Sequence, residues 1–272
     1  MPENYDKTLV SYVDVLGFAE LLKERTSTDI ARLLRTMKQN FAAGGRVHRT
    51  RNDEIVKIFK SFNFSDLIVR TTRIEPDAEI RDIIESELFY LSENQLSLAV
   101  EGILIRGGIC TDELCAVPED SIVFGPALVK SYKLESEYAV YPRIVIDRDM
   151  IWEAQDKGYI AFWQDYCSRG DDGAYFVDYL FGASLTGLEV GMPGDQPDAE
   201  RRIQGHRDMI VNFVEKRIRG QSNRIAERIK QKWTWLGLYH NSTIRRLKER
   251  LQQSTKGRNL DRFLVPEESL KF

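Results

Sequence analysis

Two kinds of apolar periodicity alternate along the first two thirds of this 272-residue chain, and their order limits the folds that it can adopt. Short runs rich in β-branched and aromatic residues predict strands, and longer stretches with apolar residues at three- and four-residue spacing predict helices. Predicted strands cover 8–15, the two halves of 55–71, 102–110, 143–147 and 174–180, and predicted helices cover 18–41, 77–100 and 125–135. Hairpins beside helical crossovers favour an α+β fold of the ferredoxin-like kind, with an antiparallel-rich sheet and helices.

A turn-rich segment divides the chain into two predicted domains. Residues 191–198 (GMPGDQPD) concentrate glycine, proline and aspartate, which interrupt regular structure. We therefore expect a first domain over residues 1–190 and a helical extension over residues 191–272. Apolar residues at helical spacing between 210 and 229 predict one long helix in the extension, and a second is expected over 242–253.

The extension is strongly basic. Residues 201–262 contain 17 Lys or Arg against 5 Asp or Glu. One interpretation is a structural arm whose apolar stripe packs on its own domain or on a partner, with the basic side chains in solvent. The alternative is a nucleic-acid surface. Because acidic residues such as Glu215 and Glu227 are interspersed and no DNA-binding motif is present, we do not expect nucleic acid as a partner.

The composition is ordinary for a soluble globular protein, with 42% hydrophobic and 30% charged residues. No apolar run approaches the ~20 residues that span a bilayer, and no signal-peptide pattern is present, so we expect no membrane partner. Three cysteines without a Cys-x-x-Cys pair argue against structural zinc and predict a cytoplasmic location with buried, inert thiols. His48, His206 and His240 lack metal-ligand spacing and are interpreted as surface or capping residues.

Two aspartates stand at the ends of predicted strands, where a carboxylate is costly unless it is paired or bound to a metal. Asp14 closes the apolar run TLVSYVD, and Asp66 lies in the turn between two strands. Carboxylates on adjacent strands suit Mg²⁺ or Mn²⁺, which are hard cations that prefer oxygen ligands. The alternative for each aspartate is a role in a turn or helix cap, but their shared placement after apolar strands favours the metal.

The residues after Asp14 predict an anion site. Leu16, Gly17 and Phe18 begin the next predicted helix. Amide groups at a helix N-terminus lack partners within the helix and lie at the positive end of its dipole, which favours anions. We therefore expect these three residues to face an anion such as a triphosphate.

Four segments share their order and spacing with motifs of a known enzyme family. They are Tyr12–Phe18 (YVDVLGF), Asp66 in its turn, Arg106–Ile109 (RGGI) and Gly125–Glu135 (GPALVKSYKLE). Together they resemble the class III nucleotidyl cyclases, whose motifs are Phe-x-Asp-Ile-x-Gly-Phe, a Gly-Asp hairpin, Arg-x-Gly-Ile and Gly-x-x-Val-Asn-x-Ala-x-Arg-Leu-Glu. A serine replaces the hairpin glycine. The resemblance covers residues 8–147, about half of the chain, and implies a class III cyclase catalytic domain followed by the helical extension.

The resemblance implies a cyclisation reaction, in which the 3′-hydroxyl of a nucleoside triphosphate attacks its own α-phosphate and pyrophosphate leaves. Asp14 and Asp66, with the Val15 carbonyl, would hold two Mg²⁺ or Mn²⁺ ions per active site. Arg106 would bind the triphosphate. Lys133 stands where the family has its transition-state arginine and would neutralise charge on the α-phosphate.

The sites of this family lie between two cyclase domains, so the resemblance also implies an obligate homodimer with two composite sites. One protomer would supply Asp14, Asp66 and Arg106, the other would supply Phe62, Ile122, Val129 and Lys133, and Lys130 is an alternative to Lys133.

The positions that read a purine in adenylyl cyclases are apolar here. The family's adenine-binding lysine and aspartate correspond to Phe62 and Ile122, and its motif asparagine corresponds to Val129. The smaller, drier base pocket expected from these residues resembles that of the bacterial pyrimidine cyclases of Pycsar antiphage systems, which make cyclic UMP or cyclic CMP. The resemblance therefore implies a uridylate or cytidylate cyclase, with UTP favoured over CTP, whose product signals to a separate cyclic-nucleotide-sensing effector.

Two alternatives stay open at this point. One is a purine nucleotide cyclase that recognises its base without the lysine and aspartate. The other is a catalytically inactive regulator with a cyclase fold that binds nucleotide or nucleic acid. The presence of both Asp14 and Asp66 argues against the second, because an inactive protein has no need for two costly carboxylates.

Overall fold

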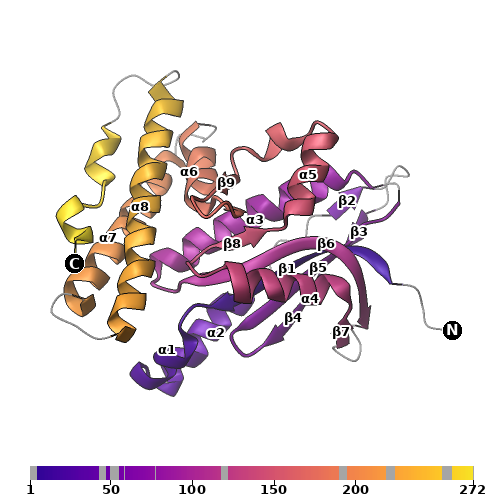
Figure 1. Ribbon diagram of the computed structural model, residues 1–272, viewed down its shortest axis with the longest axis horizontal. Coiled ribbons are helices and arrows are strands. Elements are labelled where there is room, and N and C mark those ends of the chain that lie inside the picture. Colours follow the sequence, from indigo (N-terminus) through magenta and orange to yellow (C-terminus); the bar gives the residue numbers. More distant parts are fainter. Residues whose placement is uncertain are drawn as a thin grey trace.

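The computed structural model describes residues 5–42, 47–49, 55–57, 59–76, 78–117, 122–189, 195–218, 224–252 and 259–271 (Figure 1). Its mixed α+β architecture confirms the fold class expected from the sequence. The main sheet contains, in spatial order, β4 (Phe59–Phe64), β5 (Leu67–Arg73), β1 (Asp6–Val15), β6 (Ile105–Val117), β8 (Ile144–Ile146), β10 (Tyr175–Val177) and β9 (Cys167–Arg169). In addition, β7 (Ile122–Phe124) pairs with β6, and β2 (Val47–Arg49) pairs with β3 (Ile55–Lys57).

The strand order places β1 at the centre of the fold. Strands β6, β1, β5 and β4 are each antiparallel to their neighbours, and this is the order of a ferredoxin-like βαββαβ unit. Strand β8 then pairs in parallel with β6. A parallel pair needs a crossover, and α4 (Pro126–Lys133) with the π-helical turn η2 (Leu134–Tyr138) provides it.

Alternation along β1 gives the sheet two different faces. Leu9 and Val13 are almost fully buried in the main core, which α2 (Ser27–Ala42) and α3 (Ile80–Val100) help to form. Val10 belongs to a smaller cluster beneath α4, on the opposite face. Asp14 points to the α4 side as well, because side chains an even number of positions apart share a face of a strand.

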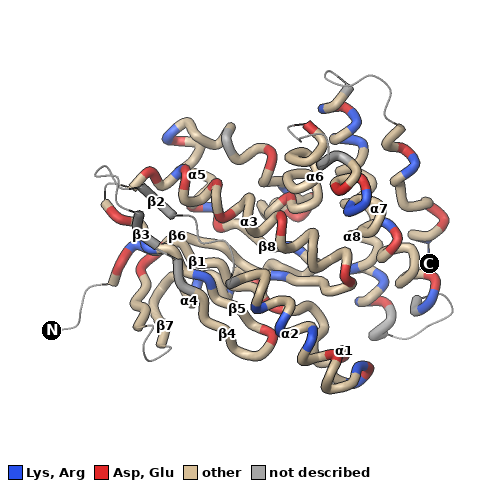
Figure 2. The backbone as a smooth tube through the Cα atoms, turned by 180° about the vertical axis from the view of Figure 1, so that it is seen from behind, with Lys and Arg blue, Asp and Glu red and all other residues tan. Residues whose placement is uncertain are grey.

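The C-terminal helices share the main core with the sheet domain. Helices α6 (Tyr179–Glu189), α7 (Asp195–Phe213) and α8 (Arg224–Gln252) pack together at one end of the sheet (Figure 1). Arg202 pairs with Glu93 of α3 at 2.8 Å, and Arg246 pairs with the buried Asp178 at 2.5 Å. Acidic and basic residues are mixed along α7, whereas α8 carries mainly basic residues (Figure 2). These contacts agree with the structural arm expected from the sequence, and the domain boundary near residue 191 stays a prediction.

Three expectations about helix boundaries are wrong. The helix expected over 18–41 is two helices, α1 (Phe18–Glu24) and α2, because the backbone is extended at Arg25. The apolar positions between 210 and 229, expected to form one long helix, belong to α7, to η4 and to α8, and α8 begins at Arg224 rather than near residue 242. The remaining helical segments are α5 (Arg148–Asp156), η3 (Ile160–Trp163), η4 (Val214–Ile218), η5 (Leu260–Phe263) and η6 (Glu267–Leu270). Among the described residues, no helix combines the length and the apolar character that crossing a bilayer requires.

The three cysteines are free thiols. Cys110 is buried, whereas Cys115 and Cys167 are partly buried. Burial raises the pKa of Cys110 and that of Cys167 to about 12. Thiols with so high a pKa stay protonated near neutral pH and are poor nucleophiles, which agrees with the inert role expected for Cys110 and Cys167.

The interpretation of His206 and His240 as surface or capping residues is wrong, because both are fully buried between α7 and α8. Their Nδ1 atoms are 2.9 Å apart, His206 Nε2 is 2.8 Å from the Tyr179 hydroxyl, and His240 Nε2 is 2.8 Å from the carbonyl of Phe263. Since a carbonyl only accepts, His240 Nε2 carries a proton, His206 Nδ1 donates to His240 Nδ1, and Tyr179 donates to His206. The side chain of His48 lies outside the described residues.

Acid should weaken the packing of α7 against α8 around His206 and His240. Burial lowers the pKa of His240 to about 4 and holds that of His206 well below its usual value. Unfolded histidine titrates near pH 6.5, so the unfolded chain binds more protons below that pH, and each histidine removes about 1.4 kcal/mol of stability per pH unit. Urea unfolding at pH 7 and pH 5 measures this loss.

The His240→Gln variant provides the comparison, because its amide still donates to Phe263 but does not titrate. We expect the pH-dependent loss attributable to these histidines to fall by about half in the variant. Other titrating groups are common to both proteins and cancel in the difference. Identical pH dependence in wild type and His240→Gln would contradict the assignment.

Candidate active site

Antiparallel pairing of β1 with β5 brings the two predicted metal aspartates together. Asp14 is paired with Leu67, and Asp66 immediately precedes Leu67 in the turn that joins β4 to β5. The two carboxyl groups are hydrogen-bonding neighbours. Burial, then the charge of Asp66 and that of Glu135, raise the pKa of Asp14 to about 7. When both carboxyls are ionised they repel each other, and a shared cation would remove that repulsion.

The turn that positions Asp66 has an unusual backbone conformation. Ser65 adopts φ 57°, in the left-handed region that glycine occupies most readily. A serine in this region costs on the order of 1–2 kcal/mol. The turn is therefore held by the pairing of β4 with β5 on either side of it, and this pairing places Asp66 beside the end of β1.

Arg106 connects the carboxylate pair to a buried glutamate. It lies directly opposite Asp14 on β6, with Nη2 3.6 Å from Asp14 Oδ2 and 2.5 Å from Glu135 Oε1. Glu135, on η2, is 3% exposed. Burial raises the pKa of Glu135, and Arg106 opposes this rise by favouring the carboxylate. The sequence did not indicate a site role for Glu135, because a glutamate at the end of a short amphipathic helix is usually solvated.

Glycine allows η2 to reach the sheet. A Cβ atom at Gly108 would lie 2.3 Å from the Ser131 carbonyl oxygen and 2.5 Å from Leu134 Cβ. A larger residue would therefore force the end of α4 away from β6. The Arg-Gly-Gly segment thus combines a site residue with the close packing that brings Glu135 to it.

The chain turns sharply after Asp14 and enters α1. Gly17 caps the helix with φ 78°. The N–H of Leu16 donates to the carbonyl of Leu104 at 2.8 Å, so this amide is already engaged within the fold. The expected anion contact therefore stays a prediction for Gly17 and Phe18.

The residues expected from a second protomer lie on the α4 side of the sheet. Phe62 is 6% exposed and packs in the small cluster beneath α4. Ile122 on β7 and Val129 on α4 are 47% and 54% exposed, and Lys133 is exposed at the end of α4. Their roles in base and phosphate binding stay predictions.

The two lysines of α4 differ in their partners. The Lys130 ammonium lies 2.5 Å from Asp147 and 2.6 Å from Asp149. Lys133 is exposed, and no carboxylate of the described residues forms an ion pair with it. Lys133 is therefore the better candidate for contact with a substrate.

The carboxylate pair fits a divalent cation that arrives with phosphate. No three His, Cys, Asp or Glu side chains of the described residues are grouped to hold a metal. Mg²⁺ is often held by one or two carboxylates, with substrate phosphates and water completing its octahedral shell. Asp14 and Asp66 match that donor set, and the Val15 carbonyl stays a predicted further ligand.

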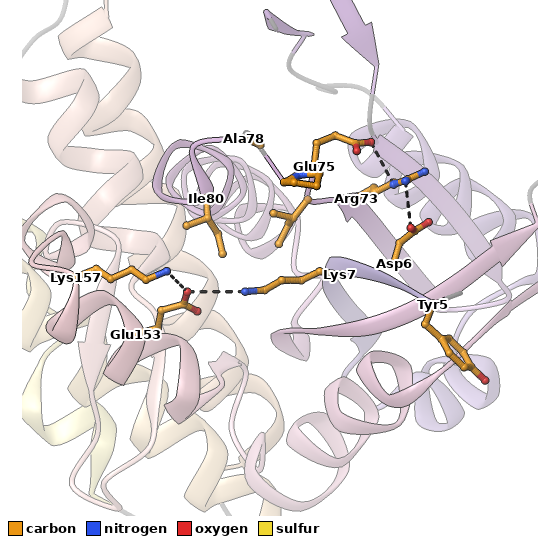
Figure 3. A pocket seen from close by; sticks show the side chains of 11 residues that line it. Tyr5, Asp6, Lys7, Arg73, Glu75, Ala78, Ile80, Glu153 and Lys157 are labelled. Carbon is orange, nitrogen blue, oxygen red and sulfur yellow. Dashed lines mark hydrogen bonds and ion pairs between the residues drawn. The ribbon is translucent and has the colours of Figure 1, made fainter. Parts of the chain in front are cut away.

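A cavity of about 430 Å³ lies elsewhere, beside the first residues of β1 (Figure 3). Asp14, by contrast, is close to the last residue of that strand. The ion pairs in this cavity join Arg73 to Asp6 and Glu75, and Glu153 to Lys7 and Lys157. These charges balance one another, so we assign the chemistry to the Asp14 end of the sheet.

Comparisons with known proteins add a likeness in structure. No family model and no curated protein sequence matches this chain. Among solved structures, the chain is similar to the adenylyl cyclase CyaB from P. aeruginosa, with 16% sequence identity over 64% of this chain and 95% of that chain and a TM-score of 0.44. A likeness at this level carries no argument about activity, which depends on the site residues themselves.

Replacing one aspartate of the pair should stabilise the metal-free protein at alkaline pH. Raising the folded-state pKa of Asp14 favours folding at low pH, and this contribution is lost as pH rises from about 4 through about 7. Asp66→Asn removes the opposing charge, and we expect a gain of about 1–2 kcal/mol at pH 8 in EDTA, given partial solvent screening. Thermal or urea unfolding measures the gain.

A ligand that binds only the folded state stabilises it, so Mn²⁺ should stabilise the wild type. The Asp66→Asn variant should lose this stabilisation, because it lacks one of the two proposed metal ligands. Asp171→Asn, at an exposed position, is the matched control and should keep the wild-type response. Equal Mn²⁺ stabilisation of wild type and Asp66→Asn would count against a metal site at this pair.

Proposed function

We propose that this protein is a nucleotide cyclase that converts a nucleoside triphosphate into its 3′,5′-cyclic monophosphate and pyrophosphate. The observation that carries the proposal is the half-buried Asp14–Asp66 pair, with the pKa of Asp14 raised to about 7 and Arg106 directly opposite. Two acidic groups suited to divalent ions and one cation suited to phosphate meet at a single point of the sheet. This combination fits a metal-dependent reaction at a polyphosphate.

The proposed mechanism is in-line displacement at the α-phosphate. Asp14 and Asp66 would hold two Mg²⁺ or Mn²⁺ ions, which supply charge neutralisation and a lowered pKa for the 3′-hydroxyl. Arg106 would bind triphosphate oxygens, and Glu135 holds its guanidinium in place. A bond forms between the 3′-oxygen and the α-phosphorus while the bond to the bridging oxygen breaks. The hydroxyl proton passes to solvent, and pyrophosphate leaves.

We propose a homodimer with composite sites, in which Lys133 of the second protomer stabilises charge on the α-phosphate. Support comes from large apolar side chains exposed on the α4 side of the sheet. Phe64, Phe124, Val129 and Tyr132 are 45%, 45%, 54% and 50% exposed. Exposed apolar residues of this size mark interaction surfaces when they gather on one side of a protein. A second copy covering them would bring its own Lys133 toward the first copy's carboxylates.

We further propose a pyrimidine substrate, UTP before CTP, and a role for the cyclic product as a second messenger in antiphage defence that acts on a separate effector protein. The support is chemical. Phe62 and Ile122 are apolar where recognition of adenine would need a donor and an acceptor. Phe62 is 6% exposed and packed in the cluster beneath α4, so it adds apolar character to this region and offers no hydrogen-bonding group. A purine cyclase that uses other groups for base recognition is the alternative, and the substrate assay separates the two.

Incubation with each of the four nucleoside triphosphates and Mn²⁺ tests the activity, with cyclic product and pyrophosphate measured by chromatography and mass spectrometry. We expect cyclic UMP or cyclic CMP from the wild type. Asp66→Asn should lower kcat/KM by at least about 100-fold, and Glu135→Gln by about 10-fold, because Arg106 loses its charged partner. Asp171→Asn is the control. Absence of product from every triphosphate would overturn the proposal.

Subunit complementation tests the composite site. Asp66→Ala and Lys133→Ala should each abolish activity alone. Equal mixing and re-association should restore about a quarter of the wild-type activity per chain, because half of the dimers are mixed and each carries one intact site. No recovery in mixtures shown to exchange subunits would exclude a site shared between protomers.

A further inference from the structure

The rotation of α8 about its own axis is set by stacked aromatic rings. Trp233 stacks on Phe213 with centroids 3.8 Å apart and an interplanar angle of 11°. Trp235 stacks on Tyr141 with centroids 5.0 Å apart and an angle of 6°. Because the two tryptophans occupy different faces of the helix, the two contacts together determine the direction of every other side chain on it.

The Trp235 contact brings α8 to the end of the sheet that holds the candidate site. Tyr141 lies two residues before Arg143, whose carbonyl accepts a hydrogen bond of 3.1 Å from the N–H of Gly107. Gly107 is the neighbour of Arg106. Figures 1 and 2 both show the first turns of α8 and the start of α1 at this end of the molecule.

Lys232 precedes Trp235 by three positions and therefore lies on the same side of α8, one turn closer to the N-terminus of the helix. It is partly buried. Burial and the nearby charge of Arg106 lower the pKa of Lys232, whereas Glu20 of α1 acts in the opposite direction. The charges of Arg106 and of Glu20 on α1 therefore both act on the Lys232 ammonium group.

The charge balance around Lys232 differs from that of other lysines on this helix. Lys230 pairs with Glu227 at 2.9 Å, and Lys248 pairs with Asp261 at 2.6 Å. Within the described part of the chain, Lys232 forms no ion pair with a carboxylate, and its cationic neighbours include Arg106 and Arg228. Positive groups that approach one another in a partly buried position are stabilised by a polyanion between them.

We propose that Lys232, supplied by the C-terminal extension, is a phosphate-binding residue that acts with Arg106 of the same chain on the triphosphate of the substrate. The proposal rests on the function proposed above and extends it, because it makes α8 part of the site. Arg106 is fixed by Glu135 on one side, and Lys232 would contact the phosphates from the α1 side. The basic extension then contributes to substrate binding as well as to the core.

The test compares Lys232→Gln, Lys232→Met and Lys232→Arg with a control, Lys248→Gln, at the far end of the same helix. Calorimetry with inorganic tripolyphosphate and Mn²⁺ measures phosphate affinity, and steady-state kinetics measure KM and kcat. Loss of one charged contact should raise both Kd and KM about 10-fold, with a smaller effect on kcat. Lys232→Arg should recover most of the affinity, and Lys248→Gln should match the wild type. Lys232→Met keeps the aliphatic stem, so it separates loss of charge from loss of packing.

The outcomes distinguish this proposal from the function that it extends. A wild type that makes cyclic nucleotide, with unchanged Kd and KM in both Lys232→Gln and Lys232→Met, overturns the role of Lys232 and leaves the cyclase intact. A wild type that makes no cyclic product but binds tripolyphosphate through Lys232 overturns the cyclase and leaves the phosphate site. A wild type that neither binds tripolyphosphate nor makes product overturns both.

Discussion

The meeting of Asp14, Asp66 and Arg106 at one end of β1 is the constraint on which the interpretation of this molecule depends. These residues meet only if β5, β1 and β6 pair in one register. A shift of one residue would turn Asp14 to the opposite face of the sheet. Burial and the neighbouring charge of Asp66 both oppose ionisation of Asp14 and raise its pKa. A divalent ion with a polyphosphate would satisfy both the acidic pair and Arg106. This is the chemical basis of the function proposed for the protein.

The C-terminal extension belongs to the same physical unit as the sheet. Trp235 stacks on Tyr141 and Tyr239, and the guanidinium of the buried Arg143 lies within 5.8 Å of the Trp235 ring centroid while it pairs with Asp172. These contacts join α8 to the segment between η2 and β8. Since η2 carries the glutamate that holds Arg106, disturbance of α8 should be felt at the candidate site. The surplus of basic residues has a structural explanation too, because Arg202, Arg246 and Arg250 pair with carboxylates of the first domain.

Local sequence patterns predicted the strands and the carboxylate pair well. The run before Asp14 is apolar and β-branched, and the Ser65–Asp66 turn separates two clear strands, so both features are local. The buried histidines and Glu135 were not predictable in this way. His206 and His240 are polar residues on helices, and their burial depends on each other and on Tyr179, which is 27 residues from His206. Their neutral state is acceptable because each ring nitrogen has a partner.

The sequence by itself determined the order of strands and helices, the α+β class and the candidate aspartates, because these follow from periodicity and from the cost of a carboxylate beside an apolar strand. Tertiary structure alone decided that Glu135 pairs with Arg106, that two histidines face each other in the core, and that Trp235 of α8 stacks on Tyr141 near the Arg106 end of the sheet. Each of these depends on contacts between residues far apart in the chain. Such contacts arise from packing of whole elements, and a local pattern of residue types does not encode the distance or angle at which two elements meet.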